Sequence, residues 1–377
     1  MKKNSMKKGF TLIELLAVII ILAIIALIAT PIILNVIDDA KKSAGLSEAN
    51  MIYSGIENYC SVEEMKEQMD SSYVRICNNQ MTAEEVSKMV NLGNANILEI
   101  GYNGNKLTSL KVESNNHEYT LCWNDKFVMD DEECPKLSVS FAEDSWETIA
   151  KVVKLGKASE VYNVGDTKEV TVEGYTNGDE QTFTVRIANI STPEECNSEG
   201  FSQTACGFVL EFADIITTYQ MDDMKYRYWP DTELYSFVND TIYNALPSDL
   251  KNVIIDTYTL SHYYYNDYNE VTYETTSIDK LYLLSPKEVW GDYDLFSDYT
   301  ATLTRQLDYY KNNGVTEDNY SGAIKTYQGS ADDWWLRAHY ESGCNRGFFT
   351  VMSDGDYNYV YPYGFNMLGV APAFRIG

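Results

Sequence analysis

The sequence predicts an α+β fold: a long N-terminal helix, a small antiparallel sheet packed on it, and then a larger α+β domain. Three observations predict this order. No charged residue occurs in the 23 positions from Leu15 to Ile37, helical periodicity continues beyond them, and short β-rich segments separated by turns follow. The 377 residues are enough for two or three domains. We expect four segments, with limits at 1–9, 10–37, 38–136 and 137–377.

The amino terminus is basic, and the segment after it is long enough to cross a bilayer. Residues 1–9 contain four lysines and no acid, and Glu14 is the only charge between them and Asp38. An uncharged stretch of this length spans a bilayer as a helix. A secretory signal peptide fits poorly, because its apolar region is shorter and a small-residue cleavage site should follow it. The basic leader is expected to stay inside, which leaves the bulk of the chain outside.

The junction between leader and apolar segment resembles the class III signal of type IV prepilins and related pseudopilins. The matching residues, KKGFTLIELL, run from Lys7 to Leu16. In that family a membrane peptidase cuts after the glycine and methylates the new amino terminus. The resemblance therefore implies cleavage between Gly9 and Phe10, N-methylation of Phe10, and an assembly role for Glu14. A carboxylate in hydrocarbon is costly unless paired, so Glu14 should seek the Phe10 amine of a neighbouring subunit.

The same resemblance implies partners and a location. Prepilin peptidase and other pilin subunits are the expected partners. The chain should lie in the membrane by its N-terminal helix before assembly and in a surface filament afterwards. Pro31 lies where the helix of this family often kinks, since proline removes a helix hydrogen bond.

A small head should follow the membrane segment. Apolar residues recur at near-helical spacing over 38–67, and strand signals occur at 97–102, 107–112 and 119–123. We expect these strands to form an antiparallel sheet that packs on the helix, as in pilin heads.

Seven cysteines fit an exported protein, in which thiols pair where their geometry allows. Proximity suggests three disulfides without proving their connectivity: Cys60–Cys77, Cys122–Cys134 and Cys196–Cys206. Cys344 is then left over. Metal ligation is the alternative, but no C-x-x-C spacing exists. The Cys122–Cys134 pair resembles the carboxy-terminal disulfide loop of many pilins.

The last domain should contain both helices and strands. Helical patterns cover 145–162, 231–244 and 247–258, and alternating patterns cover 168–173 and 182–187. Its end resembles a family of secreted and surface domains with a WWLR motif and a closing G-V-x-P-A-F-R-I. The matching residues are Trp334–Arg337 and Gly369–Ile376. Such domains are similar to the C-type-lectin-like fold, and the resemblance implies binding rather than catalysis.

Tyrosine-rich tracts alternate with these framework motifs. Of the 30 tyrosines, 23 follow Phe212. In an extended segment, tyrosines at every second position line one face. They could form a ligand surface for a protein or glycan, or cover a β face against the rest of the domain. The expected ligand-binding residues are His339, Tyr340, Asn345, Tyr357, Tyr359, Tyr361, Tyr363 and Asn366. Trp334, Trp335, Arg337 and Arg375 are interpreted as framework, with Asp332 or Asp333 as a partner for Arg337.

Composition and motifs together predict a function. The chain has 56 acidic residues against 29 Lys and Arg, a formal net charge of −27, so nucleic acid is an unfavourable partner. No combination of acid, base and nucleophile is visible, and we expect no enzyme, cofactor or metal. We expect a type IV pilin-like surface protein that displays its last domain for adhesion. Because the chain is bulky for a major subunit, we expect a minor or tip subunit. The alternative is a pseudopilin of a secretion or DNA-uptake machine.

Overall fold

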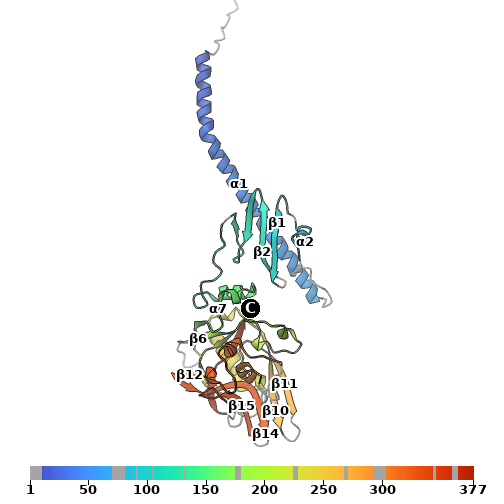
Figure 1. Ribbon diagram of the computed structural model, residues 1–377, viewed down its shortest axis with the longest axis vertical. Helices are drawn as coiled ribbons and strands as arrows, with labels where there is room; N and C mark the ends of the chain where they lie inside the picture. Colours follow the sequence, from blue (N-terminus) through green and yellow to red (C-terminus); the bar gives the residue numbers. More distant parts are fainter. Residues whose placement is uncertain are drawn as a thin grey trace, which may run out of the picture. The chain divides into compact units, whose positions relative to one another are not determined.

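The computed structural model describes residues 11–69, 81–90, 92–103, 106–130, 132–174, 180–223, 228–266, 271–292, 303–342, 345–358 and 364–377. The chain divides between Pro135 and Lys136 into two compact units, called unit 1 and unit 2 below. Figure 1 shows the elements of each unit.

Unit 1 begins with helix α1, which runs unbroken from Leu12 to Met69. Its first part exposes almost every apolar side chain, for example 86% of Leu12 and 79% of Leu27, and the helix is long and apolar enough to cross a membrane. Pro31 does not end it. The hydroxyl of Thr30, beside the proline, donates to the carbonyl oxygen of Ala26 at 2.6 Å. The apolar surface is stable only when lipid or neighbouring helices cover it.

The second part of α1 carries the head of unit 1. A four-stranded antiparallel sheet has the order β1 (Asn96–Asn103), β2 (Lys106–Ser114), β3 (His117–Leu121) and β4 (Phe127–Met129). Ala49, Ile52 and Ile56 of α1 are buried in one core with residues of this sheet. The short helix α2 (Ala83–Ser87) begins with a capping box between Thr82 and Glu85. The helix and strands expected for the head are confirmed.

Gly45 explains how closely helix and sheet approach each other. The ring of Tyr119 in β3 lies where a Cβ atom of residue 45 would be, and its hydroxyl donates to the carbonyl oxygen of Lys42 at 2.9 Å. Glycine weakens a helix by about 1 kcal/mol relative to alanine. At this position it makes room for a buried tyrosine.

Unit 2 contains two larger sheets. One is fully antiparallel, in the order β5 (Thr167–Glu173), β6 (Glu180–Asn189), β7 (Val209–Phe212), β18 (Ala373–Ile376) and β9 (Ile254–Ile255). Helix α3 (Trp146–Lys154) buries one apolar face in the same core. Strand β18 lies between β7 and β9, so residues near 375 are in the interior of this sheet.

The second sheet of unit 2 is mixed. Its path is β11 (Val271–Asp279), β10 (Thr257–Asn266), β14 (Trp334–Ser342), β15 (Asn345–Val351) and β16 (Tyr357–Asn358), and β17 (Met367–Val370) joins β14 to β8 (Thr217–Gln220). Strand β10 runs parallel to β14. Figure 1 shows β10, β11, β14 and β15 side by side. Strands β12 (Lys325–Tyr327) and β13 (Ser330–Asp332) form a separate hairpin.

The remaining elements of unit 2 are short. The helices are α4 (Ala158–Val161), α5 (Glu233–Ser236), α6 (Tyr243–Ala245), α7 (Ser248–Lys251), α8 (Pro286–Trp290) and α10 (Asp308–Asn312). Four short 3₁₀-helices are described: η1 (Glu194–Asn197), η2 (Gln203–Ala205), η3 (Trp229–Asp231) and η5 (Ser321–Ala323). The element η4 (Phe237–Ile242) is a π-helix. The α+β class is confirmed.

One predicted element is wrong. A helix was expected over 247–258, but it ends at Lys251, and β9 and β10 take up the rest. Ile254, Ile255 and Thr257 are β-branched and favour strands. Their pairing with β18 and β11 outweighs the helical periodicity.

Candidate functional site

Glu14 and Thr11 cap the first turn of α1. Its carboxylate accepts hydrogen bonds from the backbone N–H of Thr11 at 2.9 Å and from the Thr11 hydroxyl at 2.8 Å. The Glu14 N–H donates back to that hydroxyl at 3.4 Å. This reciprocal arrangement is a capping box. Glu14 therefore has partners within its own helix in the single chain, while Gly9 and Phe10 lie outside the described residues.

In unit 2 the parallel pairing of β10 with β14 brings two distant tracts together. Tyr263 lies opposite His339, Tyr264 opposite Tyr340, and Asn266 opposite Ser342. The Tyr263–Asn266 segment was not among the residues expected to bind a ligand. Its composition, three consecutive tyrosines and an asparagine, was the available signal. We call the paired segments 263–266 and 339–342 the tyrosine end of the sheet.

The expected ligand-binding residues differ in how exposed they are. His339 is buried, and its ring packs edge-on against Phe348 with centroids 4.8 Å apart. The ring of Tyr357 packs edge-on against the ring of Trp290, with centroids 5.9 Å apart. Tyr340 and Asn366 are half-buried. Asn345 opens β15, and only its backbone is described; Tyr359, Tyr361 and Tyr363 lie outside the described residues. Ligand contact at these positions stays a prediction.

Behind the tyrosine end lies a buried ion pair. Both guanidinium Nη atoms of Arg337 bind the carboxylate of Glu288 at 2.6 Å, and both side chains are fully buried. Nη1 also donates to the carbonyl oxygen of Leu283 at 2.7 Å, and Nε to that of Leu260 at 3.1 Å. The second carboxylate oxygen of Glu288 accepts from the Ser285 N–H at 2.9 Å, which caps α8. This pair fixes β14 against β10 and α8.

The expected partner of Arg337 was therefore wrong. Asp333 instead accepts from the backbone N–H of Ser353 at 2.7 Å, and Asp332 accepts from the N–H of Asp333 at 2.9 Å. The two aspartates satisfy nearby backbone, while β14 carries Arg337 into the interior. Trp334 and Trp335 are fully buried too, as expected of framework residues.

A second buried charge cluster joins the five-stranded sheet to the β12 hairpin and to α10. Glu211 binds Lys325 at 2.9 Å, Arg186 at 2.8 Å and the Tyr310 hydroxyl at 2.9 Å. Burial would raise the pKa of Glu211, but the charges of Arg186 and Lys325 lower it. Burial also lowers the pKa of Lys325 to about 8. Removing Glu211 would leave Arg186 and Lys325 buried without their counter-charge, so the cluster is structural.

In comparisons with known protein families, two segments of the chain match. Residues 4–30 match the prokaryotic N-terminal methylation motif. The chain carries a type IV pilin-like signal. Residues 209–377 match a domain of unknown function, DUF6273. No curated protein and no solved structure matches the chain.

The pilin-like signal indicates the role of α1. Together with the apolar helix it supports membrane anchoring followed by incorporation into a surface filament. The motif also implies processing by prepilin peptidase and assembly with other pilin subunits. Glu14 is the charged group that such a helix must accommodate in lipid.

The DUF6273 match is shorter than the folded unit that contains it. It begins at β7, whereas β5, β6 and α3 precede it and share its core. Val170, Val185 and Ile187 pack with Leu210 and Phe374 in that core. Residues from Lys136 onward thus complete the unit.

Two of the expected disulfides are present. Cys122–Cys134 lies in unit 1 and Cys196–Cys206 in unit 2. Cys60 lies in α1, and its expected partner Cys77 is outside the described residues, as is Cys344. Among the described residues, no group of three or more His, Cys, Asp or Glu side chains could hold a metal ion.

Proposed function

We propose that this chain is a minor or tip subunit of a type IV filament and that unit 2 binds a surface ligand for adhesion. The observation that carries the proposal is the parallel register of β10 with β14, which aligns Tyr263–Asn266 with His339–Ser342. Tyrosine offers a large rigid contact face with a polar tip. Tyr263, Tyr264 and Tyr265 on one strand and Tyr340 on the next would provide such a surface without loop ordering.

The interior of unit 2 supports this role. The Arg337–Glu288 pair holds β14 against β10 and α8, and the Glu211 cluster holds the five-stranded sheet against the β12 hairpin. A binding surface on rigid strands loses little entropy when it binds. The framework and the polar aromatic edge therefore suit recognition rather than catalysis, and we assign no reaction to the unit.

The size of unit 2 suggests the position of the subunit. Unit 2 spans Lys136–Gly377, which adds a whole domain to an otherwise ordinary head. Packed at every position of a filament, such a domain would crowd its neighbours. A minor or tip subunit avoids this crowding.

Purified filaments that contain the intact chain should bind immobilised proteins or glycans, measured by surface capture. Replacing Tyr264 and Tyr340 with serine should reduce capture at least tenfold without lowering the melting temperature. Tyr327→Ser, in the separate β12 hairpin, is the matched control. Unchanged capture contradicts the proposal. If deletion of the gene leaves adhesion intact and secreted cargo accumulates in the envelope, the pseudopilin alternative is favoured.

A further inference from the structure

Strand β10 is paired differently along its two edges. It pairs with β11 from Thr257 to Tyr265, whereas its parallel pairing with β14 begins only at Tyr263. Buried backbone N–H and C=O groups need partners, so another part of the chain must satisfy the first half of the second edge. That part is the loop closed by the Cys196–Cys206 disulfide, called the disulfide loop below.

Two side chains of the disulfide loop take the place of a neighbouring strand. Ser202 Oγ accepts from the backbone N–H of Leu260 at 3.1 Å, and Gln203 Oε1 accepts from that of Tyr258 at 3.1 Å. Residues two apart in a strand point their N–H groups to the same edge, so the loop occupies one edge of β10. Nε of Arg337 in β14 donates to the Leu260 carbonyl oxygen at 3.1 Å on this edge.

Arg337 also shows why β14 is separated from β10 at this level. Its Nη2 donates to Thr204 Oγ1 of the loop at 3.2 Å, and its backbone N–H donates to the carbonyl oxygen of Leu284 at 3.0 Å. The antiparallel pairing of β14 with β15 shifts register here too, between Trp335 and His339. The disulfide loop thus separates two strands that pair directly beyond it.

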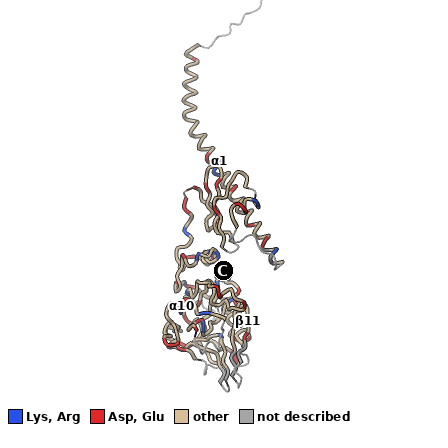
Figure 2. The backbone as a smooth tube through the Cα atoms, turned by 45° about the vertical axis from the view of Figure 1, so that its right-hand side comes forward, with Lys and Arg blue, Asp and Glu red and all other residues tan. Residues whose placement is uncertain are grey.

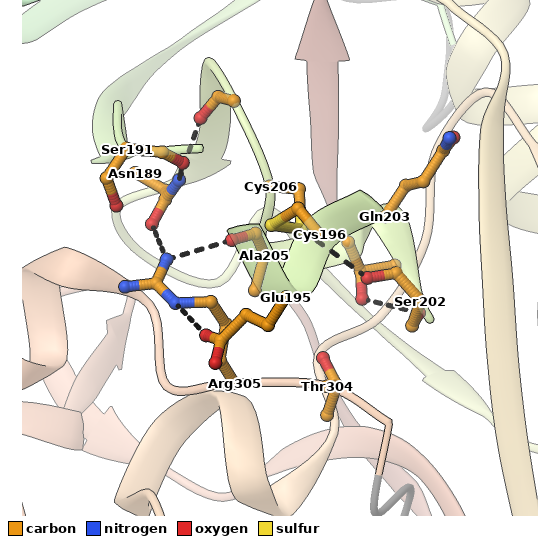
Figure 3. Close-up of a disulfide and its surroundings, with 12 residues drawn as sticks. Asn189, Ser191, Glu195, Cys196, Ser202, Gln203, Ala205, Cys206, Thr304 and Arg305 are labelled. Carbon is orange, nitrogen blue, oxygen red and sulfur yellow. Dashed lines mark hydrogen bonds and ion pairs between the residues drawn. A yellow bond between two sulfur atoms is a disulfide. The ribbon is translucent and has the colours of Figure 1, made fainter. Parts of the chain in front are cut away.

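The disulfide loop is itself held in place. The Cys196–Cys206 bond closes it, and Arg305 contacts both of its sides. Nη1 of Arg305 donates to the Ala205 carbonyl oxygen at 3.0 Å, and Nε lies 3.3 Å from Glu195 Oε1. Figure 3 shows this guanidinium on one side of the disulfide and Gln203 pointing away from it. The loop therefore presents its hydrogen-bonding side chains from a fixed base.

Two of the few basic residues of the chain contact this loop. The chain has 29 Lys and Arg against 56 Asp and Glu, and Figure 2 shows acidic positions along both units. Arg305 and Arg337, which bind the loop, have side chains that are 14% and 0% exposed. A guanidinium donates several hydrogen bonds at fixed angles, which favours a single position of the loop.

We propose that Ser202 and Gln203 are positioning residues that set where β10 and β14 begin to pair, and that the Cys196–Cys206 bond keeps them in place. Because the loop occupies the edge as far as Leu260, β14 pairs with the residues beyond it, in the observed register. A slip by one residue would change which residues of the two tracts lie opposite each other. The inference rests on the proposed binding role of the tyrosine end and adds the element that aligns it.

The test measures hydrogen–deuterium exchange by mass spectrometry on the full chain in detergent. Gln203→Leu removes an acceptor whose bonds lie at Tyr258 and Arg375, yet amide exchange should become at least tenfold faster throughout the tyrosine end. Ser202→Ala, which leaves the Arg375 contact intact, should give the same pattern. Gln203→Glu keeps the acceptor and should retain most of the protection. Ser198→Ala, at an exposed position of the same loop, is the matched control.

The role of the disulfide is tested by a second set of variants. Replacing both Cys196 and Cys206 with serine opens the loop and should give the same local increase in exchange. Replacing both Cys122 and Cys134, which form the disulfide of unit 1, is the matched control and should leave the tyrosine end unchanged. Melting temperatures verify that each variant is folded, and the Gln203 and Ser202 variants decide the proposal if the open loop does not fold.

Three results overturn the proposal. Faster exchange confined to 257–260 in folded Gln203→Leu would mean that the loop only satisfies the backbone beside it. An equal increase in β5 and β6, which belong to the other large sheet, would indicate a general loss of stability. A fully protected tyrosine end after the disulfide is removed would contradict the role of the disulfide. None of these measurements needs a ligand, so failure of the adhesion proposal and failure of this one are distinguishable.

Discussion

Units 1 and 2 differ in which kinds of side chain they expose and bury. The first half of α1 exposes apolar side chains along its length, whereas unit 2 buries whole ion pairs such as Arg337–Glu288 and Lys325–Glu211. The exposed helix is incomplete until lipid or other subunits cover it. The charges within unit 2 are satisfied inside one chain. The exposed half of α1 therefore depends on its surroundings, whereas unit 2 satisfies its buried charges with its own residues.

The largest effect should come from removing the charge of α1. Glu14→Gln keeps a side chain that can cap Thr11 but cannot pair with an amine in lipid. We expect incorporation into sheared filaments to be lost, measured by immunoblot, while leader cleavage continues. Glu84→Gln, an exposed acid of α2, is the control. Normal incorporation of Glu14→Gln would show that charge pairing is not needed.

The corresponding change in unit 2 should affect stability instead of assembly. Glu288→Gln leaves the Arg337 guanidinium buried without its counter-charge, which costs about 3–5 kcal/mol. The melting temperature of unit 2 should fall sharply, whereas Glu147→Gln on the exposed side of α3 should leave it unchanged. A double variant, Glu288→Leu with Arg337→Met, should recover part of the loss. A loss of less than 1 kcal/mol in the free energy of unfolding, measured by chemical denaturation, would mean that the pair is not structural.

A third variant tests the close packing within unit 1. Gly45→Ala places a methyl group against the Tyr119 ring, and overpacking of this kind costs about 2 kcal/mol. Chemical denaturation should show this loss. Tyr119→Leu should relieve the clash when combined with Gly45→Ala. If Gly45→Ala stabilises the head instead, helix propensity dominates and the packing argument is wrong.

The smallest effect concerns pH. Burial lowers the pKa of His262 to about 4, against the opposing charge of Glu274, which it contacts at 3.0 Å. The neutral imidazole is favoured in the fold, so this stability is fully present above about pH 6.5 and is lost as the pH falls toward 4. Between pH 7 and 5.5 the loss should be about 1 kcal/mol. His262→Gln should flatten that part of the melting-temperature profile, and an unchanged profile would contradict the assignment.

The local features of the sequence predicted local structure well. The uncharged run and its helical continuation predicted α1, and the turn-bounded segments predicted β1 to β3. The helix expected over 247–258 failed because sheet pairing across the unit outweighed local periodicity. The glutamate partner of Arg337 is 49 residues away, and no local pattern encodes that distance. The alignment of Tyr263 with His339 likewise depends on a parallel pairing that only the folded sheet defines.

The interior position of β18 has a consequence for folding. The strand pairs with β7 on one side and β9 on the other, so the five-stranded sheet stays incomplete until residues 373–376 are available for pairing. Until then β7 and β9 each present an unpaired edge. The sheet is therefore completed by its last strand in sequence, after β5, β6, β7 and β9, rather than segment by segment along the chain.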